Sequence, residues 1–572
     1  MYTLRELQKA KNLDVSGRQI KLAVLGNCST QFFSEAIEGL GRLSGLNITV
    51  CDAGYNQIEP QLFDADSEVY KFSPDYILIW MATETLYEEF LNEELINRES
   101  FASKTLERIK ECWAITERYS NARILQLNFT EYNDGILGQY SGKTPSTFLY
   151  QIRKLNYLLE EEESVNRRIF PVDILSVQNN LGRQKLFSDV YYYNAKMTVS
   201  MQVLPNLVES VVQVIRAGEG QIKKCVVVDL DDTIWGGIIS EVGLAGIEIG
   251  ELGKGAVYSD LQRWLRQLKQ YGIILAVCSK NDEETAKEPF LKHTEMILKL
   301  SDIAVFVANW EDKATNIKLI RDTLNIGLDS MIFLDDNPFE RNLVRELLPE
   351  VLVPELPNDP ALWLSYIQEQ NYFESVSYAE DSNERTERYQ TEFERKKEES
   401  RFGSLTDYLT SLEMVCEARP FEESQYPRIA QLTQRSNQFN LRTIRYTSDE
   451  IRHMAEDQKY LTFSFSLKDR FGDYGIVSVV ILRITEEKEL FIDTWIMSCR
   501  VLKRSMEDHV MNHVVKMAEK AGFETIESEY IPTNKNRAVE DIYEKMGFSR
   551  IGENRYRISI KDYRHRDTFV RG

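Results

Sequence analysis

Two aspartates, Asp229 and Asp231, follow the apolar run 225–228 and stand two residues apart. The run predicts a buried strand, and ligands of open α/β sheets bind at the carboxyl ends of such strands. Two neighbouring carboxylates at a strand end can hold Mg2+, and one of them can attack phosphorus as a nucleophile. Their type and spacing therefore predict phosphoryl-transfer chemistry at this position.

Further polar residues follow other expected strands of the same region. Ser279 offers a hydroxyl to a phosphate oxygen, and Lys313, at the start of an expected helix, can neutralise the same phosphate. Asp335 and Asp336 follow a third apolar run and add one or two carboxylates for a metal. Since all of these residues stand at strand ends, we expect them to form one site.

Each residue can be given a role in one reaction. Asp229 is expected to attack phosphorus, because an aspartate is already ionised at neutral pH and needs no activating base. Asp231 is expected to protonate the leaving oxygen and later to deprotonate the water that hydrolyses the aspartyl-phosphate. Lys313 and Ser279 would stabilise charge on the other phosphate oxygens.

Mg2+ is the expected cofactor, because it would offset the repulsion between the attacking carboxylate and the phosphate. Of the last two acids, Asp336 is favoured as a ligand and Asp335 as an acceptor that supports it. The full set of expected metal ligands is Asp229, Asp231, Asp335 and Asp336.

Some of these residues also have structural interpretations that involve no phosphate chemistry. A calcium-binding EF-hand loop from Asp229 is excluded, because its sixth and twelfth positions hold Ile234 and Ser240 instead of Gly and Glu. Ser279 could instead be an ordinary helix N-cap. Lys313 could be a solvated surface lysine.

The motifs resemble those of the haloacid dehalogenase superfamily, whose first motif is Asp-x-Asp-x-Thr. The resemblance implies a Rossmann-like core and a phosphoric monoester hydrolase or phosphotransferase. No large cap domain is expected between the motifs, only a flap at 235–237 and a short excursion through 244–255. The matched positions are Asp229, Asp231, Thr233, Ser279, Lys313, Asp335 and Asp336.

Longer phrases, at 229–237, 278–281 and 333–341, resemble the FkbH-like branch of that superfamily. Its members join an SGNH-hydrolase-like domain, a phosphatase-like core and a GNAT acetyltransferase-like domain. Some of them load a glyceryl unit from a phosphorylated glycerate onto an acyl carrier protein. Three interpretations therefore stay open: dephosphorylation of a phosphorylated small molecule or carrier-bound substrate, loading of an acyl carrier protein with dephosphorylation, and a non-catalytic scaffold.

Alternating strand and helix patterns predict a multidomain α/β protein. The expected parts are a flavodoxin- or SGNH-like domain (1–217), the phosphatase core (222–375), a charged helical linker (376–413) and an α+β GNAT-like domain (414–572). Strands are expected at 21–25, 48–51, 76–80, 123–127, 171–175, 225–230, 273–278, 303–308, 331–334, 461–467, 474–482 and 489–495, and helices at 259–271 and 313–324.

The flanking domains carry weaker signals. Ser29 follows the first expected strand, but no histidine precedes His293, and Tyr192 stands where the SGNH pattern has its histidine. A serine hydrolase needs such a base, so we expect a binding or lid role, with Ser29 as a helix N-cap. Tyr543 could be a general acid or a packed aromatic. Basic residues that could hold the phosphate of coenzyme A or phosphopantetheine are Arg500, Lys503 and Arg504.

The composition limits which classes of binding partner are expected. The net charge is −21, from 69 basic and 90 acidic residues, so nucleic acid is an unexpected partner. The 7 cysteines form no C-x-x-C pair, and no apolar run approaches the roughly 20 residues that span a bilayer. Without a signal-peptide pattern, a cytoplasmic protein with no membrane contact is expected.

Overall fold

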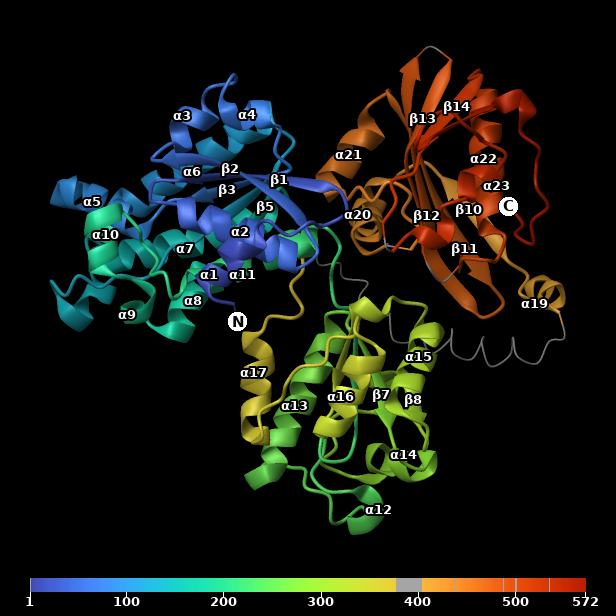
Figure 1. Ribbon diagram of the computed structural model, residues 1–572, viewed down its shortest axis with the longest axis horizontal. Helices are drawn as coiled ribbons and strands as arrows, with labels where there is room; N and C mark the ends of the chain where they lie inside the picture. Colours follow the sequence, from blue (N-terminus) through green and yellow to red (C-terminus); the bar gives the residue numbers. More distant parts are fainter. Residues whose placement is uncertain (1, 377–403, 437, 487, 499–500, 534) are drawn as a thin grey trace. The chain divides into compact units, whose positions relative to one another are not determined.

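The computed structural model describes residues 2–376, 404–436, 438–486, 488–498, 501–533 and 535–572 (Figure 1). Its contacts divide the chain into two compact units, Met1–Ala217 and Gly218–Gly572. Most of the expected charged linker lies outside the described residues.

The first unit is built on a five-stranded parallel sheet in the order β2-β1-β3-β4-β5. Its strands are β1 (Gln19–Gly26), β2 (Asn47–Tyr55), β3 (Tyr76–Trp80), β4 (Arg123–Leu127) and β5 (Ile169–Val172). Its helices are α1 (Leu4–Ala10), α2 (Gln31–Leu43), α3 (Ile58–Leu62), α4 (Glu68–Phe72), α5 (Thr83–Asn92), α6 (Phe101–Tyr119), α7 (Phe148–Val165), α8 (Ile174–Leu181), α9 (Arg183–Leu186), α10 (Asp189–Ala195) and α11 (Leu204–Gly218). The expected parallel sheet is confirmed.

The predicted bounds of the last strand of this sheet are wrong. The prediction extended the last strand over 171–175, but β5 ends at Val172. Asp173 is the N-cap of α8, and its side chain accepts a hydrogen bond from the Ser176 amide. The carboxylate thereby satisfies a free helix donor and turns the chain from strand into helix.

The second unit begins with a four-stranded parallel sheet in the order β8-β7-β6-β9. Its strands are β6 (Cys225–Val228), β7 (Ile274–Ser279), β8 (Ile303–Ala308) and β9 (Met331–Leu334). The helices that follow them are α12 (Ile239–Val242), α13 (Gly253–Gln270), α14 (Glu283–Lys292), α15 (Lys313–Leu324), α16 (Pro338–Leu347) and α17 (Trp363–Glu369). Every residue of β6, β7 and β9 is buried, which explains their unbroken apolar runs.

Helix α13 begins at Gly253, six positions before the expected start at 259. Glycines at 253 and 255 disfavour a helix by propensity, which misled the prediction. Packing requires the second of them: a Cβ on Gly255 would lie 2.8 Å from the carbonyl carbon of Ile249. Close approach of the backbones therefore overrides propensity here.

The last part of the second unit is a seven-stranded sheet in the order β10-β11-β12-β13-β14-β16-β15. Its strands are β10 (Val415–Arg419), β11 (Tyr460–Asp469), β12 (Gly472–Glu486), β13 (Glu489–Met497), β14 (Thr525–Glu529), β15 (Ser549–Arg550) and β16 (Arg555–Ser559). Its helices are α19 (Leu405–Ser411), α20 (Tyr426–Arg435), α21 (Ser448–Glu456), α22 (Met506–Lys520) and α23 (Ile542–Lys545). Only β13 and β14 pair in parallel among the described strands of this sheet, so the part is α+β in character.

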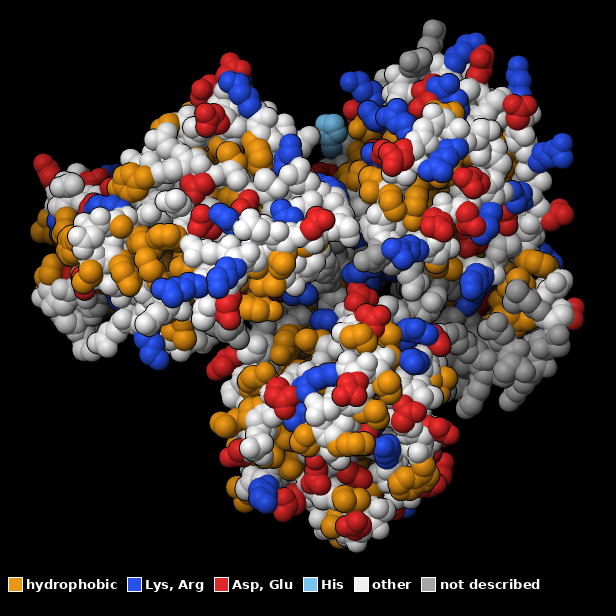
Figure 2. All heavy atoms as spheres, in the orientation of Figure 1, with side chains coloured by type: hydrophobic (Ala, Val, Ile, Leu, Met, Phe, Trp, Pro, Cys, Tyr) orange, Lys and Arg blue, Asp and Glu red, His pale blue; other side chains and the backbone are white. Residues whose placement is uncertain are grey.

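Two properties of the described residues concern the surface. No helix among them has the length and apolar character needed to cross a bilayer. On the face drawn in Figure 2, Lys and Arg side chains lie among Asp and Glu side chains. The acidic excess of the sequence is therefore not gathered into one patch on that face.

Candidate active site

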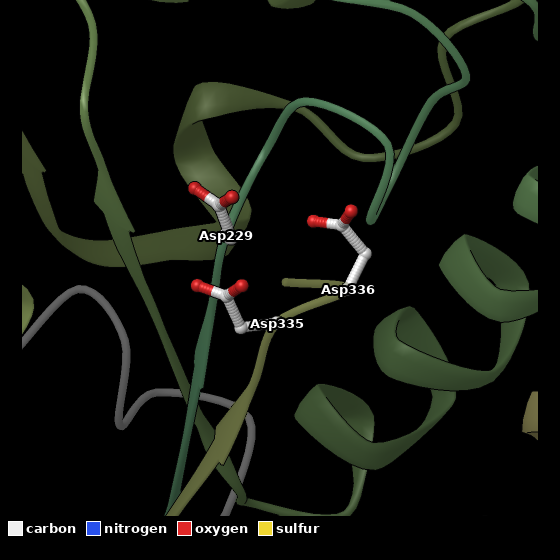
Figure 3. A group of neighbouring side chains, drawn as sticks. All are labelled: Asp229, Asp335 and Asp336. Atoms are coloured by element: carbon white, nitrogen blue, oxygen red, sulfur yellow. The ribbon is translucent and has the colours of Figure 1, made fainter. Parts of the chain in front are cut away.

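Three carboxylates converge at the carboxyl ends of β6 and β9 (Figure 3). These neighbouring parallel strands pair Val228 with Leu334, so the residue that follows each strand reaches the same edge. Asp229, Asp335 and Asp336 each offer an oxygen, and these atoms lie within 4.8 Å of one another. The structure therefore brings together three of the expected site residues.

Lys313 lies against this group. Its Nζ is 2.6 Å from Oδ1 of Asp229 and 3.3 Å from Oδ2 of Asp335, and it donates a 2.7 Å hydrogen bond to the carbonyl of Cys278. The side chain is only 2% exposed, so the surface-lysine interpretation is wrong. Asp312, the N-cap of α15, fixes the helix start that presents the lysine.

The electrostatics of the group favour a cation. Burial and the charge of Asp229 raise the pKa of Asp335 to about 7 and that of Asp336 to about 6. Burial alone would lower the pKa of Lys313, but the carboxylates of Asp229 and Asp335 raise it above its usual value. One lysine cannot balance three ionised carboxylates, so further positive charge would stabilise them.

The loop that carries the last two acids is held by Thr233 and Arg341. The buried Thr233 hydroxyl accepts from the Asp336 amide (3.1 Å) and lies 3.4 Å from Oδ1 of the same residue. Arg341 donates to the carbonyls of Asp335 (2.9 Å) and Asp336 (2.6 Å). Thr233 thus orients a carboxylate, and Arg341 is a positioning residue that the sequence did not reveal.

Asp231 has a different environment from the expected one. Its Oδ1 accepts hydrogen bonds from the Trp235 indole (3.0 Å) and the Ile239 amide (3.1 Å), and Oδ2 accepts from Asn281 (2.8 Å). Burial raises the pKa of Asp231, and these hydrogen bonds oppose the rise. Its side chain lies outside the group of three carboxylates, so the expected metal-ligand role of this side chain gains no support.

Ser279 is the last residue of β7 and is 1% exposed. It is not the N-cap of the next helix, because Asp282 caps α14. The alternative helix-cap interpretation is therefore wrong, and the hydroxyl stands at a strand end as expected. The neighbouring Cys278 is buried, and burial raises the pKa of its thiol to about 12. A thiol with that pKa is a poor nucleophile.

The segment that follows Asp231 forms only a small cover. Gly236 and Glu248 pair as an antiparallel bridge, and α12 has only four residues. A Cβ at Gly236 would lie 2.8 Å from the Tyr258 ring, so the chain packs closely against α13. Between β6 and α13 the described chain therefore contains no large cap.

The residues expected from the first unit do not form a hydrolase triad. Thr30, and not Ser29, is the N-cap position of α2, so the expected capping role of Ser29 is wrong. The Tyr192 hydroxyl donates to Oε1 of Glu88 (2.6 Å), to which Lys196 also donates (2.9 Å). The residue in the histidine position thus belongs to a polar cluster without an imidazole base.

The basic residues expected in the C-terminal part are only partly described. Arg500 lies outside the described residues, whereas Lys503 and Ser505 have left-handed backbones with φ of 64° and 58°. The Arg504 guanidinium lies over the Tyr474 ring, 5.6 Å from its centroid. Tyr543 is 0% exposed, which favours the packed-aromatic interpretation.

Comparison with known proteins agrees with the motifs. Residues 21–216 match the FkbH N-terminal domain family. The N-terminal part of protein BF1531 from Bacteroides fragilis, which contains a phosphatase domain complexed with Mg, is 43% identical; the match covers 66% of this chain and 100% of that one, with a TM-score of 0.63. Together with the aspartate motifs, these matches support a haloacid dehalogenase-type protein with a phosphatase domain. The chain belongs to the FkbH-like family of that superfamily.

Two acetyltransferases are also similar in part. The ribosomal-protein-S18-alanine N-acetyltransferase of Escherichia coli is 14% identical, over 26% of this chain and 94% of that one, with a TM-score of 0.21. The spermidine N-acetyltransferase of Vibrio cholerae, in complex with CoA and spermine, is 14% identical over 26% and 97%, with a TM-score of 0.21. None of the curated proteins compared matches the chain. The GNAT-like assignment stays a prediction.

Proposed function

We propose that the chain is a Mg2+-dependent phosphatase or phosphotransferase that acts on a phosphoric monoester through an aspartyl-phosphate at Asp229. The observation that carries the proposal is the group of three carboxylates around the buried ammonium of Lys313. The related Bacteroides protein with its Mg-complexed phosphatase domain supports it.

Mg2+ is the cofactor that fits this group of ligands. Carboxylate oxygens are the ligands that this small, hard cation prefers. Oδ2 of Asp335 is buried, and among the described residues it accepts no hydrogen bond; it lies 3.3 Å from the Lys313 ammonium, and a metal ion would give it a second cationic partner. Asp229, Asp335 and Asp336 would hold the ion, and it would neutralise charge on the phosphate oxygens during attack.

Asp229 is suited to be the nucleophile. An oxygen of its carboxylate attacks phosphorus, the bond from phosphorus to the leaving oxygen breaks, and Asp231 gives its proton to that oxygen. Asp231 is suited to this step, because burial raises its pKa and three donors fix its orientation. Water then attacks phosphorus, Asp231 takes up the proton, and phosphate leaves Asp229 free.

Lys313 and Ser279 would stabilise the negative charge of the phosphate oxygens. The ammonium already contacts Asp229 at 2.6 Å, so it also lies near a phosphoryl group that bonds to that carboxylate. A fixed charge in a buried position stabilises developing negative charge more strongly than a solvated one. The Ser279 hydroxyl at the adjacent strand end is proposed as a further donor.

Between β6 and α13 the chain contains no large cap that would restrict the substrate to a free metabolite. We therefore include carrier-bound phosphoesters among the proposed substrates. The loading of an acyl carrier protein, and the binding of acyl-CoA or phosphopantetheine by the C-terminal basic residues, stay predictions from the sequence.

A phosphate-release screen tests the proposal. Purified full-length chain is supplied with Mg2+ and a panel of small phosphoesters, with and without EDTA. We expect metal-dependent phosphate release that Asp229→Asn abolishes and Asp260→Asn retains, because Asp260 is an exposed residue that pairs with Arg263. Full turnover by a folded Asp229→Asn variant would contradict the mechanism.

A further inference from the structure

The first unit contains a cavity of 380 Å3 that the proposed reaction does not use. Its wall includes Glu131 and Asn133, which follow β4, Arg153 of α7, and Arg183 at the start of α9. It therefore lies beyond the carboxyl end of β4, where parallel sheets bind their ligands. Its volume is within the range of about 300–1,000 Å3 that is usual for small-molecule sites.

Arg183 is held firmly but uses little of its donor capacity. Its guanidinium lies 4.5 Å from the ring centroid of Tyr132 and 4.8 Å from that of Phe187, which fixes its plane. Among the described residues, it donates one hydrogen bond, from Nη2 to Glu84 (3.1 Å). Nη1 is buried and has no acceptor among the described residues. A buried N–H group without an acceptor is unfavourable. Since solvent does not reach Nη1, an anion in the cavity would contact the exposed part of the Arg183 side chain, which is 24% exposed.

Arg153 supplies a second guanidinium to the wall. Its Nη2 pairs with Glu131 at 2.5 Å, and its Nη1 lies beside Gly142, where a Cβ would be only 3.4 Å away. The lining residues thus carry two arginines and one glutamate, a net charge of +1, in a chain whose net charge is −21. Each arginine also has a carboxylate partner, Glu84 or Glu131, so an anion would be held by the N–H donors that these ion pairs leave unused.

The cavity has the chemistry of a binding site and not of a catalytic one. Its lining contains no histidine, cysteine or serine. Glu84, behind Arg183, is buried, and burial raises its pKa although Arg183 opposes the rise.

We propose that this cavity binds a small organic anion, with a carboxylate or phosphate group on the guanidinium groups of Arg183 and Arg153. Planar guanidinium groups bind both kinds of oxyanion through paired N–H donors. The amide of Gln139, which also lines the cavity, would contact the rest of the ligand. The site is separate from the aspartate cluster, and it gives the first unit a binding function without a hydrolase triad.

Isothermal titration calorimetry of the full-length chain tests this proposal. The probes are succinate for the carboxylate and inorganic phosphate for the phosphate, both in buffer from which a chelating resin has removed divalent metal, so that no chelator anion competes for the cavity. We expect at least one probe to bind, and Arg183→Gln and Arg153→Gln each to weaken it at least about tenfold. The probe that binds identifies the anionic group.

Two further variants keep the test decisive. Arg118→Gln, an exposed position on α6, should bind like the wild type. The double variant Glu84→Gln with Arg183→Gln removes both charges of the buried pair at once, so it should stay folded if Arg183→Gln alone does not. Binding of neither probe, or binding that the Arg183 and Arg153 substitutions leave unchanged, would overturn the proposal.

Discussion

The two parallel sheets of this chain carry opposite chemistry at their carboxyl edges. In the second unit, the ends of β6 and β9 gather Asp229 and two further acids around one buried lysine. In the first unit, the cavity beyond β4 presents two arginines. Sheets of the same type thus support a cation-demanding site in one unit and an anion-favouring site in the other.

The chemistry of each sheet edge is therefore decided by the side chains at the strand ends and not by the fold. Strand β6 is followed by the carboxylate of Asp229, the proposed nucleophile. Strand β1 is followed by Ser29, and Tyr192 stands at the sequence position where the SGNH pattern has its histidine. A serine without a base is a weak nucleophile, so only one of the two edges is equipped for covalent catalysis.

The largest contrast is expected from Asp231→Asn and Ser29→Ala. Loss of the acid and base at Asp231 should lower kcat by about 10²–10⁴-fold, because proton transfer contributes that much in typical enzymes. Ser29→Ala should leave kcat within about twofold, since we assign it no proton or phosphoryl transfer. Phosphate release at saturating substrate measures both. Equal losses of kcat in the two variants would contradict the assignment of proton transfer to Asp231 and of no catalytic role to Ser29.

The next contrast concerns stability. Lys313→Met leaves Asp229 and Asp335 buried without their cation, which should cost about 3 kcal/mol in the opening free energy of β6. Arg183→Met should cost less in the first unit, because it leaves one carboxylate, Glu84, without its cation instead of two, and the Arg183 side chain is 24% exposed. Hydrogen exchange resolved by peptide compares the two units in one sample. A larger loss of opening free energy in Arg183→Met than in Lys313→Met would contradict this prediction.

A smaller effect is expected from Thr233→Val. The substitution keeps the shape but removes the hydroxyl that orients Asp336, so Mg2+ affinity should fall about tenfold. Thr323→Val is the matched control, because that hydroxyl donates only to a carbonyl of its own helix. Calorimetric titration with Mg2+ measures both variants. Unchanged affinity in Thr233→Val would show that the hydroxyl does not position the ligand.

The smallest effect is a pH dependence confined to the acidic site. Since the pKa of Asp335 is raised to about 7 and that of Asp336 to about 6, the folded protein keeps protons that the unfolded chain loses above about pH 4. Without metal, the stability of this unit should therefore fall as the pH rises from about 4 to 7. Mg2+ favours the ionised acids, so its affinity should rise over the same range.

Calorimetry in two buffers with different ionisation heats counts the protons that Mg2+ releases. We expect release at pH 6 and little at pH 8, where the acids are already ionised. The same proton count at both pH values would contradict this assignment of the raised pKa values.

Much of the scaffold could be predicted because several strands are buried on both faces. The bounds of β3, β4, β8, β9 and α15 coincide with the predicted ones. An unbroken apolar run with polar neighbours marks such strands clearly. The convergence of Asp229 with Asp335 followed from the same logic, since parallel neighbours end at one edge.

The placement of Asp231 could not be predicted, because it depends on a turn. The prediction let both acids share a metal, but β6 ends at Val228 and the chain turns at Asp232, whose φ is 52°. The Asp231 carboxylate is then taken up by Trp235 and Asn281. Asn281 lies two residues after the expected site residue Ser279. This short separation is the one feature of the sequence that could have indicated that Asn281 belongs to the site.

Arg341 lies beyond sequence reasoning for another reason. Its contacts to the acidic loop run to backbone carbonyls, which any residue type provides. No pattern of side chains along the chain marks such a partner. The cavity of the first unit is similar, since its arginines come from two separate helices, α7 and α9.

The most direct test of the central claim is to locate the phosphoryl group during turnover. The Asp231→Asn variant, which should hydrolyse the intermediate slowly, is mixed with Mg2+ and a substrate from the screen and quenched in acid. Peptide mass spectrometry then locates the phosphoryl group. We predict that it lies on Asp229 and is absent when Asp229→Asn is added. A phosphoryl group on any other residue, or turnover with Asp229 never modified, would contradict the account.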